Sequence, residues 1–233
     1  MTSPRTISFR IAPEKVAEQM DRLLPSKPGF IASGAWARFL KHPAEARFES
    51  EPTWRDLTGL EFLLLHYEAG WMMQPAAWLC PRSLLDAAGP WDERLTLNDD
   101  GEYFGRVMMA ARGILFCPNS RVLYRSGLPG SLSRRKDLRS LRSLWLSTEL
   151  TCGRLLAARG DDPRFRGAVA NGWRRLAYEC YPVAPDLADA AERRFLTLGG
   201  SRIPPPGTNV FRHLARFIGW RGAKRVLGFL GRC

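Results

Sequence analysis

The stretch Gly89-Pro-Trp-Asp-Glu-Arg-Leu-Thr-Leu-Asn-Asp-Asp-Gly-Glu-Tyr-Phe-Gly-Arg106 joins a turn to a helical pattern and carries two adjacent carboxylates, Asp99 and Asp100. Apolar residues recur at helical spacing after this acidic pair, and Gly113 follows as a helix C-cap. We therefore expect a helix that begins at the acidic pair. A side chain in the first turn of a helix is held on a rigid backbone, which suits a catalytic carboxylate.

The acidic pair has a second interpretation as a helix cap. Asn98 or Asp99 suits the N-cap position, and Asp99 with Glu102 resembles a capping box that the helix dipole also favours. On these residues alone, capping is the more common explanation and catalysis stays open beside it.

The residues around this stretch predict strands and helices in alternation, which indicates an α/β architecture. The expected elements are a helix over 13–24, strand-like runs over 30–39, a short helix over 60–67, a buried strand over 74–80, a short helix over 82–88 and two short strands over 114–117 and 121–125. The first helix has one apolar face, formed by Val16, Met20, Leu23 and Leu24.

Beyond Gly130 the pattern becomes helical throughout, with expected helices over 138–159, 165–181 and 187–198. Pro204-Pro-Pro206 is the clearest linker. We therefore divide the chain into three parts: an α/β part over 7–133, an all-helical extension over 134–203, and a Pro-rich linker with a basic amphipathic tail over 204–233.

Composition narrows the class of protein. The chain has 233 residues, of which 45% are hydrophobic and eight are tryptophans, which is typical of a folded globular protein. No apolar run reaches the roughly 18 residues of a membrane span, and residues 1–10 lack a signal-peptide core, so a cytoplasmic location is expected. Five scattered cysteines and three distant histidines argue against a zinc site, a disulfide framework and a histidine-dependent mechanism.

The net charge of +12 comes from the second half of the chain, because basic and acidic residues balance over 1–125. Such asymmetry indicates an interaction surface for nucleic acid, anionic lipid or a phosphate-bearing donor. No helix-turn-helix, zinc-finger or RNA-recognition signature is present, so nucleic acid is not an expected partner; a basic nucleic-acid-binding module remains an alternative.

The tail over 207–233 contributes basic and apolar residues without any acidic one. Gly219 and Gly222 beside Trp220 favour two short amphipathic helices over one long helix. Such a segment suits an anionic membrane surface and predicts a peripheral position at the inner face of the membrane. The alternative is that its apolar faces pack on the helical extension.

The segment 71–106 resembles the second half of a family 2 glycosyltransferase. The resemblance rests on Arg82-Ser-Leu-Leu85, on the turn Gly89-Pro-Trp-Asp-Glu93 and on the acidic pair after it. Downstream, 114–133 is similar to the family's two strands and Tyr-Arg loop. Upstream, Ala12-Pro-Glu-Lys-Val-Ala-Glu-Gln19 is similar to the helix that follows the family's metal-binding aspartates, so the likeness covers roughly residues 11 to 230.

This resemblance implies a GT-A-type domain that transfers a sugar, with inversion, from a nucleotide-diphospho-sugar to a glycan or lipid-linked acceptor in cell-envelope glycan biosynthesis. Asp100 would be the catalytic base and Asp99 would orient it or bind the acceptor; the order Asp-Asp replaces the more frequent Glu-Asp. Trp91 and Glu102 would bind the acceptor. The donor diphosphate would be gripped by Arg125, Arg134 and Arg135, unless these form only a solvated basic helix start.

The chain departs from the family before its first helix. The family's aspartate cluster for Mg²⁺ or Mn²⁺ belongs where this chain has Thr6-Ile-Ser-Phe-Arg10, which contains no carboxylate. We therefore expect no metal cofactor in this chain, an incomplete GT-A domain without its nucleotide-binding half, and no sugar transfer by the chain alone. A non-catalytic remnant or sugar-binding partner subunit is the alternative.

Overall fold

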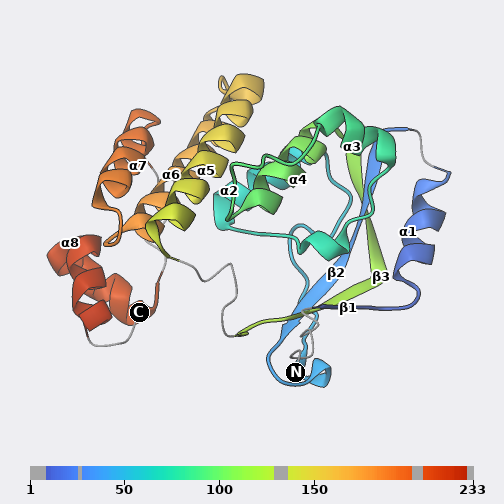
Figure 1. Ribbon diagram of the computed structural model, residues 1–233, viewed down its shortest axis with the longest axis horizontal. Helices are drawn as coiled ribbons and strands as arrows, with labels where there is room; N and C mark the ends of the chain where they lie inside the picture. Colours follow the sequence, from blue (N-terminus) through green and yellow to red (C-terminus); the bar gives the residue numbers. More distant parts are fainter. Residues whose placement is uncertain (1–8, 26–27, 129–135, 201–206, 230–233) are drawn as a thin grey trace. The chain divides into compact units, whose positions relative to one another are not determined.

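The computed structural model describes residues 9–25, 28–128, 136–200 and 207–229, and shows a mixed α/β protein (Figure 1). The chain divides into two compact units. The first unit comprises Met1–Asp92 and Asp100–Arg134, and the second comprises Glu93–Asp99 and Arg135–Cys233. The mixed composition of strands and helices confirms the α/β class in this general form.

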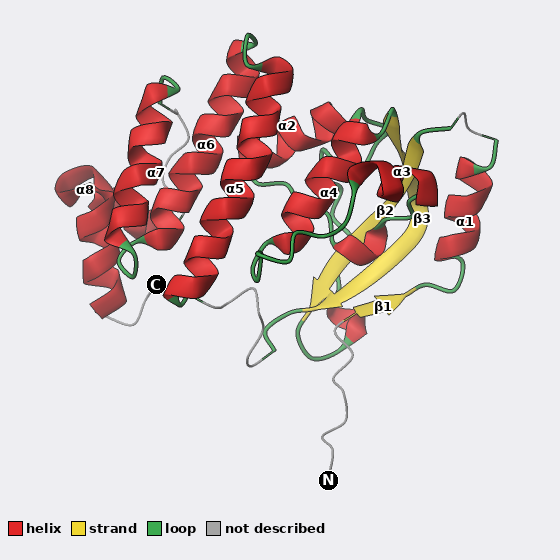
Figure 2. Ribbon diagram, turned by 45° about the horizontal axis from the view of Figure 1, so that its top comes forward, coloured by secondary structure: helices red, strands yellow, loops and turns green. Residues whose placement is uncertain are grey.

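The first unit contains a three-stranded sheet in the order β1-β3-β2 (Figure 2). Strand β1 (Phe9–Ile11) pairs antiparallel with β3 (Gly113–Arg125), and β2 (Phe30–Phe39) pairs parallel with β3. A Cβ atom at Gly34 would lie 2.2 Å from the Ser120 carbonyl oxygen, so only glycine fits where the register of this pair shifts. The two strands expected over 114–117 and 121–125 are therefore one strand with an irregularity between them.

The prediction of a buried strand over 74–80 is wrong. Pro75–Ala77 forms a 3₁₀ turn, and Gln74 Oε1 accepts a hydrogen bond from Ala76 N at 2.5 Å. Proline lacks the N–H that a sheet ladder needs and fixes a turn-like φ, which explains the turn. Only Leu79 keeps a strand-like contact, an isolated antiparallel bridge to Ala32 of β2.

Helix α1 (Lys15–Leu23) buries its polar side against the sheet region. Lys15 is 3% exposed and Gln19 is fully buried. Gln19 Nε2 donates to Ala77 O at 2.8 Å, while Lys15 Nζ donates to Gln19 Oε1 at 2.6 Å and to Trp78 O at 3.4 Å. These bonds satisfy carbonyl groups of the turn that replaces the expected strand.

The apolar residues of α1 are therefore turned outward, contrary to the usual expectation for an amphipathic helix. Val16 is 50% exposed, Met20 40% and Leu24 72%. The nearby Ile11 at the end of β1 is 45% exposed. This outward set, which we call the α1 apolar face, adds exposed hydrophobic area to the first unit.

Three more α-helices complete the described part of the first unit: α2 (Gly59–Ala69), α3 (Arg82–Ala88) and α4 (Asp99–Ala110), whose first residue is counted with the second unit. A capping box of Thr58 and Glu61 starts α2, and a left-handed Gly70 ends it. A Cβ atom at Gly59 would lie 1.8 Å from Met108 O, so α2 begins in direct backbone contact with α4. A short 3₁₀ turn, Pro43–Glu45, follows β2.

The second unit is helical, with α5 (Leu138–Arg159), α6 (Pro163–Cys180) and α7 (Pro185–Thr197) side by side (Figures 1 and 2). Asp137 caps α5 and Asp162 caps α6 through their side chains. Leu141 and Leu155 of α5 are each 1% exposed, as expected from the apolar pattern of this segment.

Helix α8 (Asn209–Phe229) bends at Gly219, which has φ 72° and ψ 160°. The expectation of two short helices in the tail is confirmed. Phe211 from the first half and Ala223 and Leu227 from the second half form a buried cluster against which Tyr178 of α6 packs. Among the described helices, none combines the length and the apolar composition that a bilayer crossing requires.

Candidate functional site

The acidic pair lies at the start of α4, as the sequence indicates. Asp99 is the first residue of the helix and is exposed, and Asp100 is half-buried in the first turn. Asp100 Oδ1 accepts a hydrogen bond from Gly101 N at 2.8 Å. The positive end of the helix dipole stabilises a carboxylate in this position. This geometry serves a capping role and a catalytic role equally.

A buried ion pair fixes the first turns of α4. Glu102 is 1% exposed, and its two carboxylate oxygens accept from Arg106 Nε at 3.0 and 3.2 Å. Arg106 Nη2 donates to Glu102 Oε2 at 3.1 Å and to Pro90 O at 2.7 Å, while Nη1 donates to Ala88 O. Arg106 therefore ties the turn after α3 to the face of α4. We call this arrangement the Glu102–Arg106 clamp.

The clamp changes the role that the sequence suggests for Glu102. A carboxylate that is almost completely buried and bonded through both oxygens to an arginine has no surface for a sugar. A role for Glu102 in acceptor binding is therefore not proposed. Its role is to hold α4 against the 88–90 turn.

Trp91 lies in the same turn and keeps part of its ring exposed. Its ring stacks on Tyr103 with centroids 4.2 Å apart and an interplanar angle of 9°, and meets Phe104 edge-on at 6.3 Å. Arg106 adds a cation–π contact to Tyr103 at 5.3 Å. Trp91 is nevertheless 44% exposed, so an aromatic surface remains available on the first unit beside the clamped turn.

The segment that leads into the acidic pair is anchored within the second unit. Ser143 Oγ of α5 accepts from Thr96 N at 2.8 Å and from Leu97 N at 2.9 Å, and donates to Leu97 O at 2.9 Å. Asn98 has a left-handed φ of 59°, and its Nδ2 donates to Ser147 Oγ at 2.9 Å. Two serines one helical turn apart thus fix the backbone immediately before Asp99.

A basic pocket of about 430 Å³ lies beside this anchored segment in the second unit. Its lining includes Arg94, Arg139 and Arg142, with Thr96 and Ser143. Sequence reasoning missed these three arginines as a group because Arg94 is more than 40 positions from the other two. The i,i+3 spacing of Arg139 and Arg142 on one predicted helix was the only local signal.

Of the arginines expected to grip a diphosphate, the structure describes Arg125 alone. Arg125 lies at the end of β3, opposite Phe39, and its Nε donates to Leu40 O at 3.3 Å. Arg134 and Arg135 lie outside the described residues. Arg125 is therefore on a different element from the acidic pair and from Trp91.

The described residues offer no cluster that would hold a divalent metal. Within 9–25, 28–128, 136–200 and 207–229, no group of three His, Cys, Asp or Glu side chains is placed to hold a metal ion. Mg²⁺ and Mn²⁺ require several oxygen ligands, and the acidic pair supplies two neighbouring carboxylates. We therefore derive no step through a metal.

Two cysteines near Lys15, Cys80 and Cys117, have raised thiol pKa values and are unreactive as nucleophiles. Burial raises the pKa of the Cys80 thiol to about 12 and that of the Cys117 thiol to about 11. A thiol is a nucleophile only as a thiolate, so neither group is activated at neutral pH.

Comparison with protein-family models, with curated proteins and with solved structures finds no match to this chain.

Proposed function

We propose that the chain is the acceptor-side part of an inverting, family 2-like glycosyltransferase with a GT-A-type domain. In this proposal Asp100 is the base that takes a proton from an acceptor hydroxyl, and Asp99 orients that base or binds the acceptor. Trp91 stacks on a sugar ring of a glycan or lipid-linked acceptor. The donor would be a nucleotide-diphospho-sugar.

The observation that carries the proposal is the fixed placement of the acidic pair. Asp100 sits in the first turn of a helix whose neighbouring turn is locked by the Glu102–Arg106 clamp. Holding a base in a defined position is what general-base catalysis requires, because proton transfer demands hydrogen-bond geometry.

The aromatic surface of Trp91 supports the acceptor part of the proposal. Apolar faces of sugar rings pack on exposed aromatic rings, and here the ring is already immobilised by its stack on Tyr103. An immobilised side chain loses little conformational entropy when a ligand binds.

Phosphate recognition is proposed separately for the second unit. Arg94, Arg139 and Arg142 line one pocket and could form charge-assisted hydrogen bonds with phosphate oxygens. We propose this pocket in addition to the set Arg125, Arg134 and Arg135, of which the structure describes Arg125 alone. A phosphate-bearing acceptor would present this chemistry to the pocket.

The acceptor proposal is tested by glycan binding to the whole chain. Binding to hexose oligosaccharides on a glycan array, followed by saturation-transfer NMR on the hits, should give millimolar or tighter affinity. Trp91→Ala should weaken that affinity about fivefold or more, since stacking on an aromatic ring contributes about 1 kcal/mol or more. Phe217→Ala removes an exposed ring from the other unit and should leave binding unchanged. Absence of any glycan binding would refute the acceptor site.

The catalytic part is tested through Asp100. In any preparation that transfers sugar, Asp100→Asn should lower turnover by about 10²-fold or more, because loss of a general base typically costs 10²–10⁴-fold. Asp99→Asn should be milder. Near-normal turnover of a folded Asp100→Asn protein would reduce the acidic pair to a helix cap.

Donor binding is tested by calorimetry with UDP- and GDP-sugars and Mn²⁺. We expect no binding tighter than millimolar by the chain alone, since its described residues offer no metal cluster. Micromolar binding would contradict the incomplete-domain proposal while leaving the acceptor test independent.

A further inference from the structure

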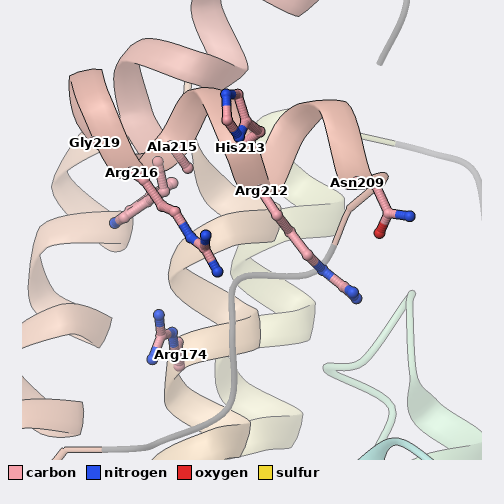
Figure 3. A pocket seen from close by; sticks show the side chains of 8 residues that line it. Arg174, Asn209, Arg212, His213, Ala215, Arg216 and Gly219 are labelled. Atoms are coloured by element: carbon pink, nitrogen blue, oxygen red, sulfur yellow. The ribbon is translucent and has the colours of Figure 1, made fainter.

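A second basic pocket lies at the bend of α8 and shares no residue with the candidate site (Figure 3). It has a volume of about 660 Å³ and is lined by Arg174, Asn209, Arg212, His213, Ala215, Arg216, Gly219 and Trp220. No acidic residue is among these lining residues. Figure 3 shows Arg212 and Arg216 extending from α8 toward the side on which Arg174 of α6 lies.

The fold holds this pocket in place. Phe211 is 2% exposed and packs edge-on against Tyr178 at 5.5 Å, which fixes the first half of α8 on α6. After the bend at Gly219, Trp220 packs between Tyr178 and Tyr181 at 5.9 and 5.5 Å. Gly219 has a positive φ, and a residue with a side chain would strain the backbone in this conformation.

The acidic neighbour Glu192 acts electrostatically on the Arg174 guanidinium and is shared with other donors. The carboxylate of Glu192 accepts from Arg221 Nη2 at 2.6 Å and from Trp220 Nε1 at 3.5 Å. After Glu192 the chain contains no further Asp or Glu. Burial lowers the pKa of the Arg174 guanidinium, a cost that a bound anion would offset.

Exposed apolar side chains lie on the same helix as the pocket arginines Arg212 and Arg216. Phe217 is 75% exposed, Val210 65% and Ile218 48%, and Phe229 at the end of α8 is 93% exposed. Helical spacing places Arg212 and Arg216 on one flank of the helix and Val210 and Phe217 on another. A nucleic acid would use the arginines but would leave these apolar groups in water, whereas a lipid surface uses both.

We propose that α8 docks on an anionic membrane, with a lipid headgroup phosphate held in the pocket by Arg174, Arg212 and Arg216. In this arrangement Phe217 and Ile218 enter the boundary between headgroups and acyl chains. The pocket supplies charge-assisted hydrogen bonds to phosphate oxygens, and the apolar side chains supply hydrophobic burial. The proposal does not depend on the glycosyltransferase proposal.

Co-sedimentation of the full chain with vesicles tests the proposal. The chain should pellet with phosphatidylcholine vesicles that contain phosphatidylglycerol and stay in the supernatant with pure phosphatidylcholine. Binding should fall with added salt. Each arginine near an anionic surface changes affinity about fivefold, so Arg212→Gln with Arg216→Gln should weaken binding roughly 25-fold.

Two matched controls separate the pocket from general charge and general apolarity. Arg166→Gln with Arg193→Gln removes the same charge from exposed positions on α6 and α7 and should bind nearly as the unaltered chain does. Phe217→Ser should weaken vesicle binding, whereas Leu196→Ser, at a 62% exposed site on α7, should not. Circular dichroism verifies that each variant is folded.

Competing sources of phosphate are separated by further titrations. Inorganic phosphate that binds the chain in an Arg212-dependent manner without any vesicle binding would identify a soluble ligand and overturn the membrane proposal. Duplex DNA that binds with the same arginine dependence, again without vesicle binding, would overturn it in favour of nucleic acid. Equal loss of vesicle binding in the pocket variant and in the Arg166/Arg193 control would reduce the pocket to part of a diffuse positive charge.

Discussion

The Glu102–Arg106 clamp concentrates several stabilising interactions in one side chain. Arg106 satisfies a buried carboxylate, two backbone carbonyls of the preceding turn and the ring of Tyr103. Removing one partner of a buried pair leaves the other charge without compensation, which costs more than the pair itself contributes. The clamp is therefore the point at which a single substitution should most disturb the acidic pair.

We expect Glu102→Gln to lower the free energy of unfolding by about 3–5 kcal/mol, because it leaves the partly buried Arg106 guanidinium without its counter-charge. Urea denaturation followed by tryptophan fluorescence measures the change. Arg82→Gln breaks the other described i,i+4 pair, Arg82–Asp86, which is largely exposed, and should leave the urea midpoint unchanged. Equal effects of the two substitutions would contradict a structural role for the clamp.

Single residues of the candidate site differ in how far the sequence predicts them. The acidic pair is predicted because a helix start has local signals, and its position is confirmed. The role of Glu102 is not predicted, because Glu and Arg four positions apart usually form a solvated surface pair. Its burial arises from the 88–90 turn folding over α4, which is a tertiary event. The pocket of Arg94, Arg139 and Arg142 is likewise assembled from distant segments.

At the scale of elements, the approach of α2 to α4 depends on one missing side chain. Gly59 and the carbonyl of Met108 leave no room for a methyl group between the two helices. We expect Gly59→Ala to lower the thermal unfolding midpoint, since forcing a backbone shift in a packed region costs about 1–3 kcal/mol.

Gly153→Ala is the control for Gly59→Ala. No atom lies within 4 Å of a Cβ at Gly153, an exposed position within α5. Alanine is favoured over glycine inside a helix by about 1 kcal/mol, so this substitution should raise the midpoint. Circular dichroism melting should show a lower midpoint for Gly59→Ala and a higher midpoint for Gly153→Ala. A raised midpoint for Gly59→Ala would contradict the close contact between Gly59 and Met108.

Elements with strong local signals are the ones that the sequence predicts. The helix at the acidic pair, the long helix over 138–159 and the bend at Gly219 are confirmed. The strand over 74–80 fails because apolar character alone does not specify a strand, and Pro75 selects a turn. The outward orientation of the α1 apolar face is not specified by the helical pattern, because it depends on Lys15 and Gln19 donating to carbonyl groups of that turn.

For the molecule as a whole, the α1 apolar face predicts self-association. Val16 and Met20 expose a large share of their side chains on one side of α1. Exposed apolar groups that gather in one place favour contacts between copies. Sedimentation velocity should show an average mass that rises with concentration, and Val16→Lys with Met20→Lys should suppress the rise. Leu196→Lys, at an exposed apolar site on α7, serves as the control and should leave the rise unchanged.

The inward-facing Lys15 makes the stability of the folded chain depend on pH in the alkaline range. Burial lowers the pKa of the Lys15 ammonium from its ordinary value of 10.5, so the folded chain loses this proton at a lower pH than the unfolded chain does. Between the lowered pKa and 10.5 the unfolded state binds more protons, so the stability contributed by this site rises with pH. Above 10.5 the contribution is fully present, and it is lost as the pH falls through the lowered pKa.

Lys15→Met, which keeps the length of the side chain and removes the titrating group, should abolish this part of the alkaline rise in unfolding free energy. The unfolding free energies of the two proteins are measured in urea from neutral pH to above pH 10.5. Their difference at each pH isolates the Lys15 contribution, because the other titrating groups contribute equally to both proteins. Parallel curves for the two proteins would contradict the lowered pKa. A helix that turns an amino group inward and its methyl groups toward water thus couples the stability of the first unit to the pH of an alkaline medium.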